Sequence, residues 1–211
     1  REDEIYPCLR CMACISESFV PYVKYPSRIR RCPSNPTAYK EVPASRVTAA
    51  RTPKRVLVIG GGPAGMEAAS VLAERGHAVT LCEQEAGLGG ALRFARYVPF
   101  KKKVEQLLGV MVRRLECSGA EIRLNTRATP ELARELGPDV IVAALGSRPK
   151  RPDIPGGDTL VPALEALRDP ERLGQRVVIV GGGLVGCELA LQLSRRAGRS
   201  RWWTGRRRCA G

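Results

Sequence analysis

The chain has 211 residues and a formal net charge of +14, and no run of about 18 apolar residues offers a membrane span. Aromatic residues make up only 5% of the sequence and six arginines are confined to residues 196–208, so the charge does not favour a nucleic-acid partner. We expect neither nucleic acid nor a membrane to bind. The chain opens with Arg-Glu-Asp-Glu and not with a basic and then apolar leader, so we expect a cytoplasmic location.

Four of the eight cysteines lie in residues 1–36 in the pattern C-x2-C-x2-C-x17-C, and Pro-Ser-Asn-Pro follows the last one. They are Cys8, Cys11, Cys14 and Cys32. Without a secretion signal, clustered cysteines favour a metal over disulfides. Structural zinc more often pairs two C-x2-C knuckles, whereas a triple with one remote cysteine suits a [4Fe–4S] cluster. The spacing therefore predicts a cluster segment, with zinc, or free or disulfide-bonded cysteines, as alternatives.

Residues 37–54 form a predicted linker with Pro43 and Pro53, and residues 55–150 then alternate strands with helices. Short apolar runs predict strands at 55–60, 78–82, 121–124 and 140–145, and helices are predicted at 63–75 and 104–117. This alternation implies an α/β fold with a parallel, doubly wound sheet. Cys82, Cys117 and Cys187 are interpreted as small buried apolar residues.

The first strand leads into Gly60-Gly61-Gly62-Pro63-Ala64-Gly65, which fits the pattern G-x-G-x-x-G. Gly60 allows the tight turn, Gly62 lets a pyrophosphate approach the backbone, and Gly65 lets the helix pack closely on the strand. The helix N-terminus offers its free N–H groups to phosphates. Glu83 follows Gly65 by eighteen residues, close to the ~20 expected for a ribose-binding carboxylate. These residues predict a dinucleotide site.

The segment VLVIGGGPAGMEAASVLAERGHAVTLCEQEAGLGGAL resembles the FAD-binding segment of the two-dinucleotide-binding-domain flavoproteins. Residues 143–149, AALGSRP, resemble the A-T-G-x-x-P stretch of that family, with Leu145 where Thr is usual. Residues 124–129, LNTRAT, resemble a strand end that meets the adenine through its backbone. The resemblance implies further FAD contacts at Pro63, Ala64, Gly89, Gly90, Ala128, Ala144 and Gly146.

The pattern PCLRCMAC…CPSNP upstream of this segment is similar to the family of 2,4-dienoyl-CoA reductase, trimethylamine dehydrogenase and bile-acid-type NADH:flavin oxidoreductases. Members of this family have an FMN-bearing (β/α)8 barrel, then the cluster cysteines, then the FAD module. The resemblance implies that the four cysteines bind a [4Fe–4S] cluster. It also implies that REDEIYPC follows the end of a barrel that is missing from this chain. The spacing before Cys32 is longer than is usual in the family.

Residues 151–175 form a Pro- and Gly-rich connection with a short helix at about 161–168. A nucleotide-binding unit then begins at residues 176–198, with a strand at 176–180, a second G-x-G-x-x-G and a helix at 184–196. By resemblance this loop binds NAD(P)H. The residues assigned to that site are Gly181, Gly183, Leu184, Val185, Gly186 and Glu188.

Residues 199–211 fit neither a strand nor a helix. Trp202-Trp203-Thr204 is encoded by TGG-TGG-ACN, and reading one base earlier gives an apolar residue, Val and Asp. Such an ending is typical of the missing second strand, and Thr204 lies eighteen residues after Gly186. We therefore expect a reading-frame shift, with a disordered basic tail as the alternative. The recovered Asp would favour NADH, because a carboxylate suits a free 2′-hydroxyl.

Together these features predict a module that passes electrons from NAD(P)H through FAD and a cluster to FMN in the barrel of the same polypeptide, which reduces an enoyl-type or related substrate. No catalytic acid or base stands out, and His77 is expected to be structural. Two alternatives stay open. One is an electron-input subunit of a glutamate-synthase-like flavoprotein, and the other is a truncated fragment without activity of its own.

Overall fold

The computed structural model describes residues 5–14, 32–38 and 48–197. The chain divides into two compact units, unit 1 with Arg1–Arg93 and Lys102–Gly146, and unit 2 with Phe94–Lys101 and Ser147–Gly211. Part of the predicted linker and all of the predicted frameshifted tail lie outside the described residues. The reading-frame shift therefore stays a prediction.

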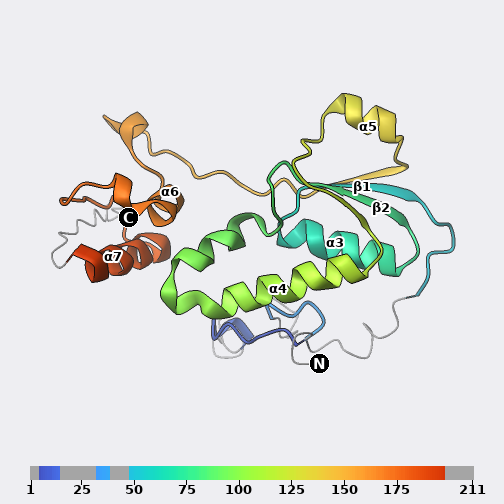
Figure 1. The fold of residues 1–211 in the computed structure, drawn as a ribbon, viewed down its shortest axis with the longest axis horizontal. Helices are drawn as coiled ribbons and strands as arrows, with labels where there is room; N and C mark the ends of the chain where they lie inside the picture. Colours follow the sequence, from blue (N-terminus) through green and yellow to red (C-terminus); the bar gives the residue numbers. More distant parts are fainter. Residues whose placement is uncertain (1–4, 15–31, 39–47, 198–211) are drawn as a thin grey trace, which may run out of the picture. The chain divides into compact units, whose positions relative to one another are not determined.

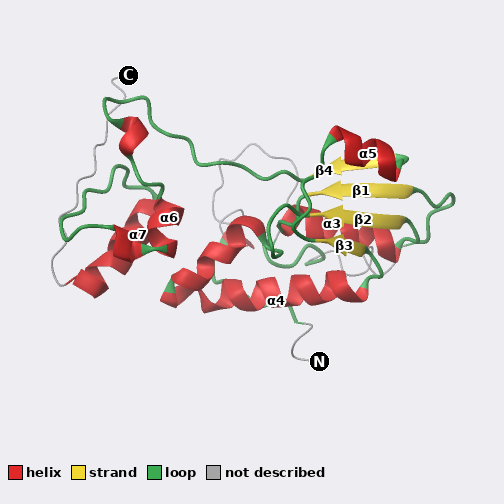
Figure 2. Ribbon diagram, turned by 45° about the horizontal axis from the view of Figure 1, so that its top comes forward, coloured by secondary structure: helices red, strands yellow, loops and turns green. Residues whose placement is uncertain are grey.

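Unit 1 is built on a parallel sheet (Figure 1), and Figure 2 shows its strand order, β3-β2-β1-β4. β1 pairs in register with β2 from Arg55↔Ala78 to Ile59↔Cys82, and β4 flanks its other edge. This arrangement confirms the predicted α/β fold with a parallel sheet. The strands are β1 Arg55–Ile59, β2 Ala78–Cys82, β3 Glu121–Arg123 and β4 Val140–Ala143.

Two helices, α3 Pro63–Glu74 and α4 Lys102–Cys117, pack against one face of this sheet (Figure 1). Alternate residues of a strand point to the same face, so Val56 and Val58 turn toward the helices together with their register partners in β2. Each fully buried apolar side chain of this kind contributes about 1.5–3 kcal/mol. The buried core consists of Val56, Val58, Val79 and Leu81 from the strands and Met66, Ala69, Leu108 and Leu115 from the helices.

A further helix, α5 Pro130–Leu136, was not predicted, although its signals are local. The Thr129 side chain caps its start by accepting the N–H of Leu132 at 3.3 Å, and Pro130 occupies the first turn. Gly137 ends it in the left-handed region with φ of 52°. A capping threonine, an early proline and a terminal glycine are the usual boundaries of a short helix.

Unit 2 combines α6 Ala163–Arg168 and α7 Leu184–Ala197 with residues from the middle of the sequence. The segment Phe94–Lys101 includes the end of η2 Gly90–Tyr97 and all of η3 Pro99–Lys101. Its Val98 is buried in the core of unit 2. The other members of that core are Ala166, Leu167, Leu189 and Leu193.

The predicted strand at 176–180 was wrong, because only Val180 makes an isolated bridge. Val178 and Val180 are 69% and 51% exposed. A parallel strand needs a partner on at least one edge to satisfy its N–H and C=O groups. The described sheet consists of β1 to β4 and does not include residues 176–180.

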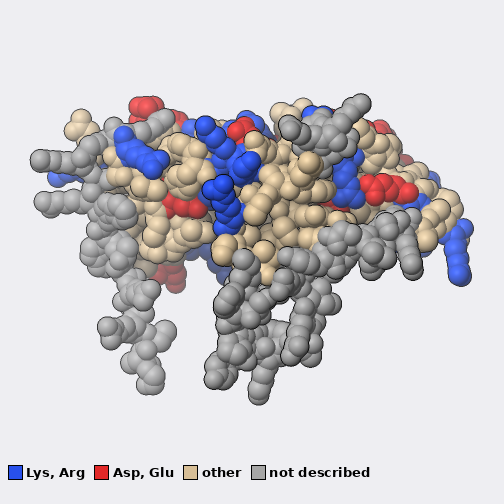
Figure 3. Space-filling view, turned by 90° about the horizontal axis from the view of Figure 1, so that it is seen from below, with Lys and Arg blue, Asp and Glu red and all other residues tan. Residues whose placement is uncertain are grey.

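The surface in Figure 3 carries Lys and Arg side chains at several separate places, interrupted by acidic and neutral residues. Within the residues that the structure describes, no helix is long and apolar enough to cross a membrane.

Candidate dinucleotide-binding site

The loop between β1 and α3 has the geometry that the three motif glycines require. Gly60 has φ of 106°, a region that favours glycine. A Cβ on Gly65 would collide with the carbonyl oxygen of Gly60, so only glycine lets α3 begin this close to β1. A Cβ on Gly62, by contrast, would meet no atom within 4 Å. The backbone is therefore open at the point where the sequence predicts a pyrophosphate.

The N-terminus of α3 is free of side-chain caps. Gly62 is the N-cap residue without a side-chain hydrogen bond, Pro63 starts the helix, and no acidic residue lies in the first turn. The first N–H groups of a helix have no partner within the helix. Those of Ala64 and Gly65 can therefore donate to a bound anion, with the positive end of the helix dipole behind them.

Glu83 lies directly beside this loop and is buried. Its Oε2 accepts the N–H of Gly61 at 2.6 Å, and its Oε1 accepts the N–H of Glu85 at 2.8 Å. Two backbone donors hold the carboxylate in one orientation at the carboxyl end of β2. A carboxylate in this position can accept hydrogen bonds from the hydroxyl groups of a ribose.

Gly61 is a site residue that the sequence analysis missed. Its N–H holds Glu83 and its carbonyl accepts the N–H of Gly89 at 2.7 Å. A Cβ at this position would lie 2.6 Å from Cδ2 of Leu88 and 3.1 Å from Cβ of Glu83. The run of three consecutive glycines was the available signal, because the motif itself requires only the first and the third.

The other predicted FAD residues come from loops at the same edge of the sheet. Gly90 approaches the first loop, since its Cβ would lie 3.1 Å from Cα of Gly62. The segment that contains Ala128 is tied to the site because Thr126 donates its N–H to the Glu83 carbonyl at 2.8 Å. Ala144 donates its N–H to the carbonyl of Ile59 at 2.8 Å. Gly146 has φ of 70° and is exposed.

The second glycine loop, in unit 2, repeats the geometry of the first. Gly181 has φ of 111°, and a Cβ on Gly186 would collide with the Gly181 carbonyl oxygen. A Cβ on Gly183 would again meet no atom within 4 Å. Leu184 and Val185, at the start of α7, are exposed. The loop conformation is therefore present although the preceding residues do not form a strand.

Glu188, predicted to contact the second nucleotide, is engaged in an ion pair within unit 2. Nζ of Lys101 donates to its Oε2 at 2.6 Å, and its side chain is only 14% exposed. Gln192, one turn further along α7, donates from Nε2 to the Tyr97 carbonyl at 3.0 Å. Both contacts hold the segment Phe94–Lys101 against the helix of the second loop.

The four predicted cluster cysteines are free thiols: Cys8 and Cys11 are exposed, and Cys14 and Cys32 are half-buried. Among the described residues, no three His, Cys, Asp or Glu side chains converge as a metal site would require. The sulfur of Cys32 shares a hydrogen bond with the Ser34 hydroxyl at 3.1 Å, which lowers the pKa of the thiol against the effect of burial. The donors suit a cluster chemically, but the ligand set is not assembled, so the cluster stays a prediction.

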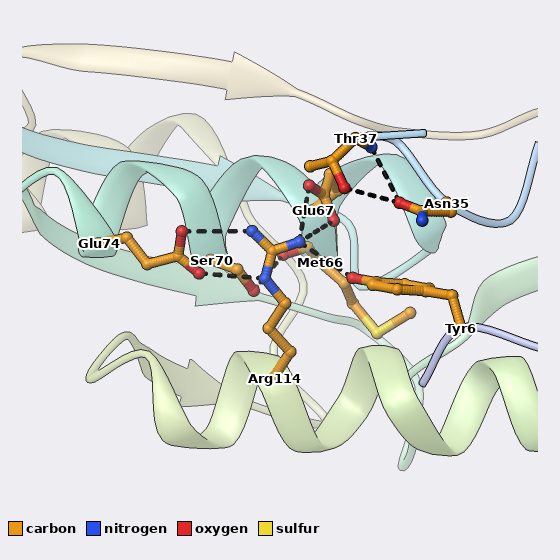
Figure 4. Close-up of polar contacts among 8 residues, drawn as sticks. All are labelled: Tyr6, Asn35, Thr37, Met66, Glu67, Ser70, Glu74 and Arg114. Atoms are coloured by element: carbon orange, nitrogen blue, oxygen red, sulfur yellow. Dashed lines mark hydrogen bonds and ion pairs between the residues drawn. The ribbon is translucent and has the colours of Figure 1, made fainter. Parts of the chain in front are cut away.

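The cysteine segment is joined to the helices of unit 1 by Arg114 of α4 (Figure 4). Its Nη1 donates to the Tyr6 hydroxyl at 3.0 Å and to both carboxylate oxygens of Glu67 at 2.9 Å. Its Nε and Nη2 donate to Glu74 at 3.0 and 3.2 Å. One guanidinium thus links the segment before Cys8 to two positions on α3.

The remaining sequence expectations have mixed outcomes. Cys82 is buried as expected, and burial raises the pKa of its thiol. The same interpretation was wrong for Cys117 and Cys187, which are exposed. Cys117 is the last residue of α4, and Cys187 lies in the first turns of α7, where neighbouring Leu184 and Val185 are also exposed. His77 has a structural contact, since its Nδ1 accepts the N–H of Lys54 at 3.1 Å.

Comparison with known proteins places this geometry among flavin-dependent enzymes. Residues 54–204 match the family model described as pyridine nucleotide-disulphide oxidoreductase. The chain is 36% identical over 206 residues to an NADH oxidase of Thermoanaerobacter brockii, covering 92% of this chain and 30% of that protein. It is 38% identical over 194 residues to a cinnamate reductase of Clostridium sporogenes, covering 90% and 28%.

A solved structure is also similar to this chain in fold and in sequence. The complex of 2-naphthoyl-CoA reductase with 2-naphthoyl-CoA matches with a TM-score of 0.75 and 31% identity, over 86% of this chain and 28% of that chain. The chain therefore spans less than a third of the length of each of these three proteins.

Proposed function

Because the chain belongs to the pyridine nucleotide-disulphide oxidoreductase family, we propose that it is the module that receives electrons from NAD(P)H on FAD within a larger flavin-dependent reductase. One observation carries the FAD assignment. Glu83 is buried and clamped by the Gly61 N–H, next to a loop that is open at Gly62. This combination supports a ribose contact at Glu83 and phosphate contacts at the start of α3, at one edge of the sheet.

Each part of the loop has a defined task in this proposal. Glu83 binds a ribose, the N–H groups of Ala64 and Gly65 bind the diphosphate, and the backbone at Gly62 leaves room for it. Gly89 is fixed against the loop by its hydrogen bond to Gly61 and borders the flavin side. The bound flavin supplies the redox chemistry, because it accepts two electrons as a hydride and can release them one at a time.

The second loop is the proposed NAD(P)H site. Its Gly181, Gly183 and Gly186 repeat the positive φ, the open face and the close helix approach of the first loop. Two loops of the same conformation suit a protein that binds two dinucleotides.

The finer proposal is a module of the 2,4-dienoyl-CoA reductase and trimethylamine dehydrogenase type. In it Cys8, Cys11, Cys14 and Cys32 bind a [4Fe–4S] cluster, and an FMN barrel in the same polypeptide reduces an enoyl-type or related substrate. The similarity to a cinnamate reductase and to 2-naphthoyl-CoA reductase supports such a substrate. The spacing and chemistry of the four free thiols support the cluster.

Anaerobic purification tests the two cofactors separately. The expected result is a flavin absorbance spectrum, FAD released on denaturation, and iron and sulfide after reconstitution. Glu83→Ala should lose FAD and keep iron, whereas Cys11→Ser should lose iron and keep FAD. Flavin without iron in the unmodified chain would contradict the cluster alone, and a colourless protein without iron would contradict both assignments.

A further inference from the structure

The helices that follow the two glycine loops carry glutamates at equivalent positions. Glu67 and Glu188 each come two residues after the last motif glycine, and each is the fifth residue of its helix. Both carboxylates are paired with a cation of their own unit. Nη1 of Arg114 lies 2.9 Å from Glu67 and Nζ of Lys101 lies 2.6 Å from Glu188.

The two cations come from unrelated places in the fold. Arg114 lies in the last turn of α4, whereas Lys101 ends the short η3 segment. Both pairs are largely withdrawn from solvent, with side-chain exposures of 26% and 27% for Arg114 and Glu67, and 31% and 14% for Lys101 and Glu188. The glutamate at this position of each loop helix is therefore paired with a cation that comes from a different place in the fold.

The reason lies in the charge near the phosphate loop. The fifth residue of a helix is about 6 Å along the axis from the first, at a rise of about 1.5 Å per residue. That distance is shorter than the Debye length of about 8 Å at physiological ionic strength. An unpaired carboxylate there would oppose the attraction of the helix N-terminus for a diphosphate.

Arg114 keeps its charge in this position. Burial works against the guanidinium, but hydrogen bonds to Glu74 and Tyr6 and the field of Glu67 raise the pKa of Arg114 above its ordinary value. A cation that cannot be lost at physiological pH is suited to neutralise Glu67 permanently.

We propose that Arg114 and Lys101 are positioning residues that act through Glu67 and Glu188: each neutralises the carboxylate one turn into its loop helix and keeps that N-terminus receptive to the diphosphate of a dinucleotide. The inference rests on the proposed function, because it requires FAD at the first loop and a nicotinamide nucleotide at the second. It assigns to two ion pairs an effect on ligand affinity, in addition to their effect on folding.

The direction in which each substitution changes FAD affinity distinguishes this role from a purely structural one. Arg114→Met leaves a carboxylate near the diphosphate, and we expect about 2- to 5-fold weaker FAD binding, the range of a charge at a helix terminus. Glu67→Gln removes that carboxylate and is expected to bind FAD at least as tightly as the unmodified chain. The double variant Glu67→Gln/Arg114→Met should recover most of the loss.

Titration of the deflavinated full-length chain with FAD, at low salt and at 0.5 M NaCl, measures these affinities. The difference between the two single variants should shrink at high salt. Arg114→Lys loses the planar fork of donors but keeps the positive charge. Because the proposed effect depends on the charge, this variant should retain FAD affinity. Lys103→Met, at an exposed position of α4, makes the same charge change away from Glu67 and serves as the control.

The same comparison applies to the second loop, with NADH as the probe. Lys101→Met is expected to weaken NADH binding, whereas Lys101→Arg, which keeps a cation beside Glu188, is not. If Glu67→Gln weakens FAD binding as Arg114→Met does, or if Arg114→Lys and Lys101→Arg fail like the two methionine variants, the inference is wrong although the proposed function stands. If the unmodified chain and all of its variants bind FAD but none binds NADH, the part of the inference that concerns Lys101 and Glu188 is wrong. A chain that binds no FAD contradicts the proposed function and the inference with it.

Discussion

The N–H of Gly61 and Oε2 of Glu83 meet at 2.6 Å across 22 residues of sequence. This bond joins the phosphate loop to the end of β2, and both of its partners are held in turn. Glu83 also accepts the N–H of Glu85, and the Gly61 carbonyl accepts the N–H of Gly89. These hydrogen bonds hold the glycine loop against the end of β2 and the residues at Gly89.

Glu83→Ala should destabilise unit 1 as well as abolish FAD binding. It leaves the buried N–H of Gly61 and the partly exposed N–H of Glu85 without their acceptor. An unsatisfied buried donor costs about 1–3 kcal/mol, and water can replace the acceptor of the exposed one. We expect a drop of about 2 kcal/mol in the free energy of unfolding, measured by urea denaturation of the apoprotein. Glu85→Ala is the matched control, because Glu85 is exposed and contributes only backbone groups here. Equal losses in both variants would contradict the prediction.

Gly62→Ala and Gly65→Ala should separate cofactor binding from folding. The methyl group at Gly62 would meet open space and its φ of −74° suits any residue, so the unfolding free energy should change by less than about 1 kcal/mol. FAD affinity should nevertheless fall, because the methyl group would occupy the space that the proposed function assigns to the diphosphate. Gly65→Ala forces α3 away from the Gly60 carbonyl and should cost about 1–3 kcal/mol or more. Thermal unfolding with and without FAD would measure both.

Tyr6→Phe should loosen the cysteine segment without loosening the helices. It removes the hydroxyl that accepts from Arg114 but leaves the pairs of Arg114 with Glu67 and Glu74. We expect faster amide hydrogen exchange in residues 5–14 and unchanged exchange in β1, with a global loss of about 1 kcal/mol at most. Tyr97→Phe, in unit 2, controls for loss of a phenol. Unchanged exchange in the segment would show that other contacts hold it.

Asp139→Asn should remove a pH-dependent contribution to stability. Oδ2 of Asp139 accepts the backbone N–H of Arg55 at 2.7 Å, and this bond, followed by the guanidinium charge, lowers the pKa of the carboxyl despite some desolvation. A lowered pKa contributes stability above the unfolded value of about 4 that is lost as the pH falls through the folded value.

The unmodified chain should therefore melt higher than Asp139→Asn at pH 7, and the gap should narrow between about pH 5 and pH 2. Asp153→Asn, at an exposed position of unit 2, is the control. A gap that stays constant with pH would mean that the carboxyl charge does not matter.

Local signals predicted most of unit 1. The strand at 78–82 was predicted to the residue, and α3 and α4 began or ended within two residues of their predicted bounds. Apolar periodicity and glycine turns act over a few residues, so a single sequence carries them. The prediction of a strand at 176–180 failed because a strand forms only beside a hydrogen-bonded neighbour, and an apolar run does not show whether such a neighbour exists.

What the sequence determined by itself is the two glycine loops, because the positive φ of Gly60 and Gly181 and the close approach at Gly65 and Gly186 are properties of glycine. The tertiary structure alone decided what surrounds them. It placed Phe94–Lys101 in unit 2, turned Gly61 toward Glu83 and paired each loop-helix glutamate with a cation. Those contacts join residues that are tens of positions apart in the sequence. They depend on how the helices pack, so a local sequence pattern cannot predict them.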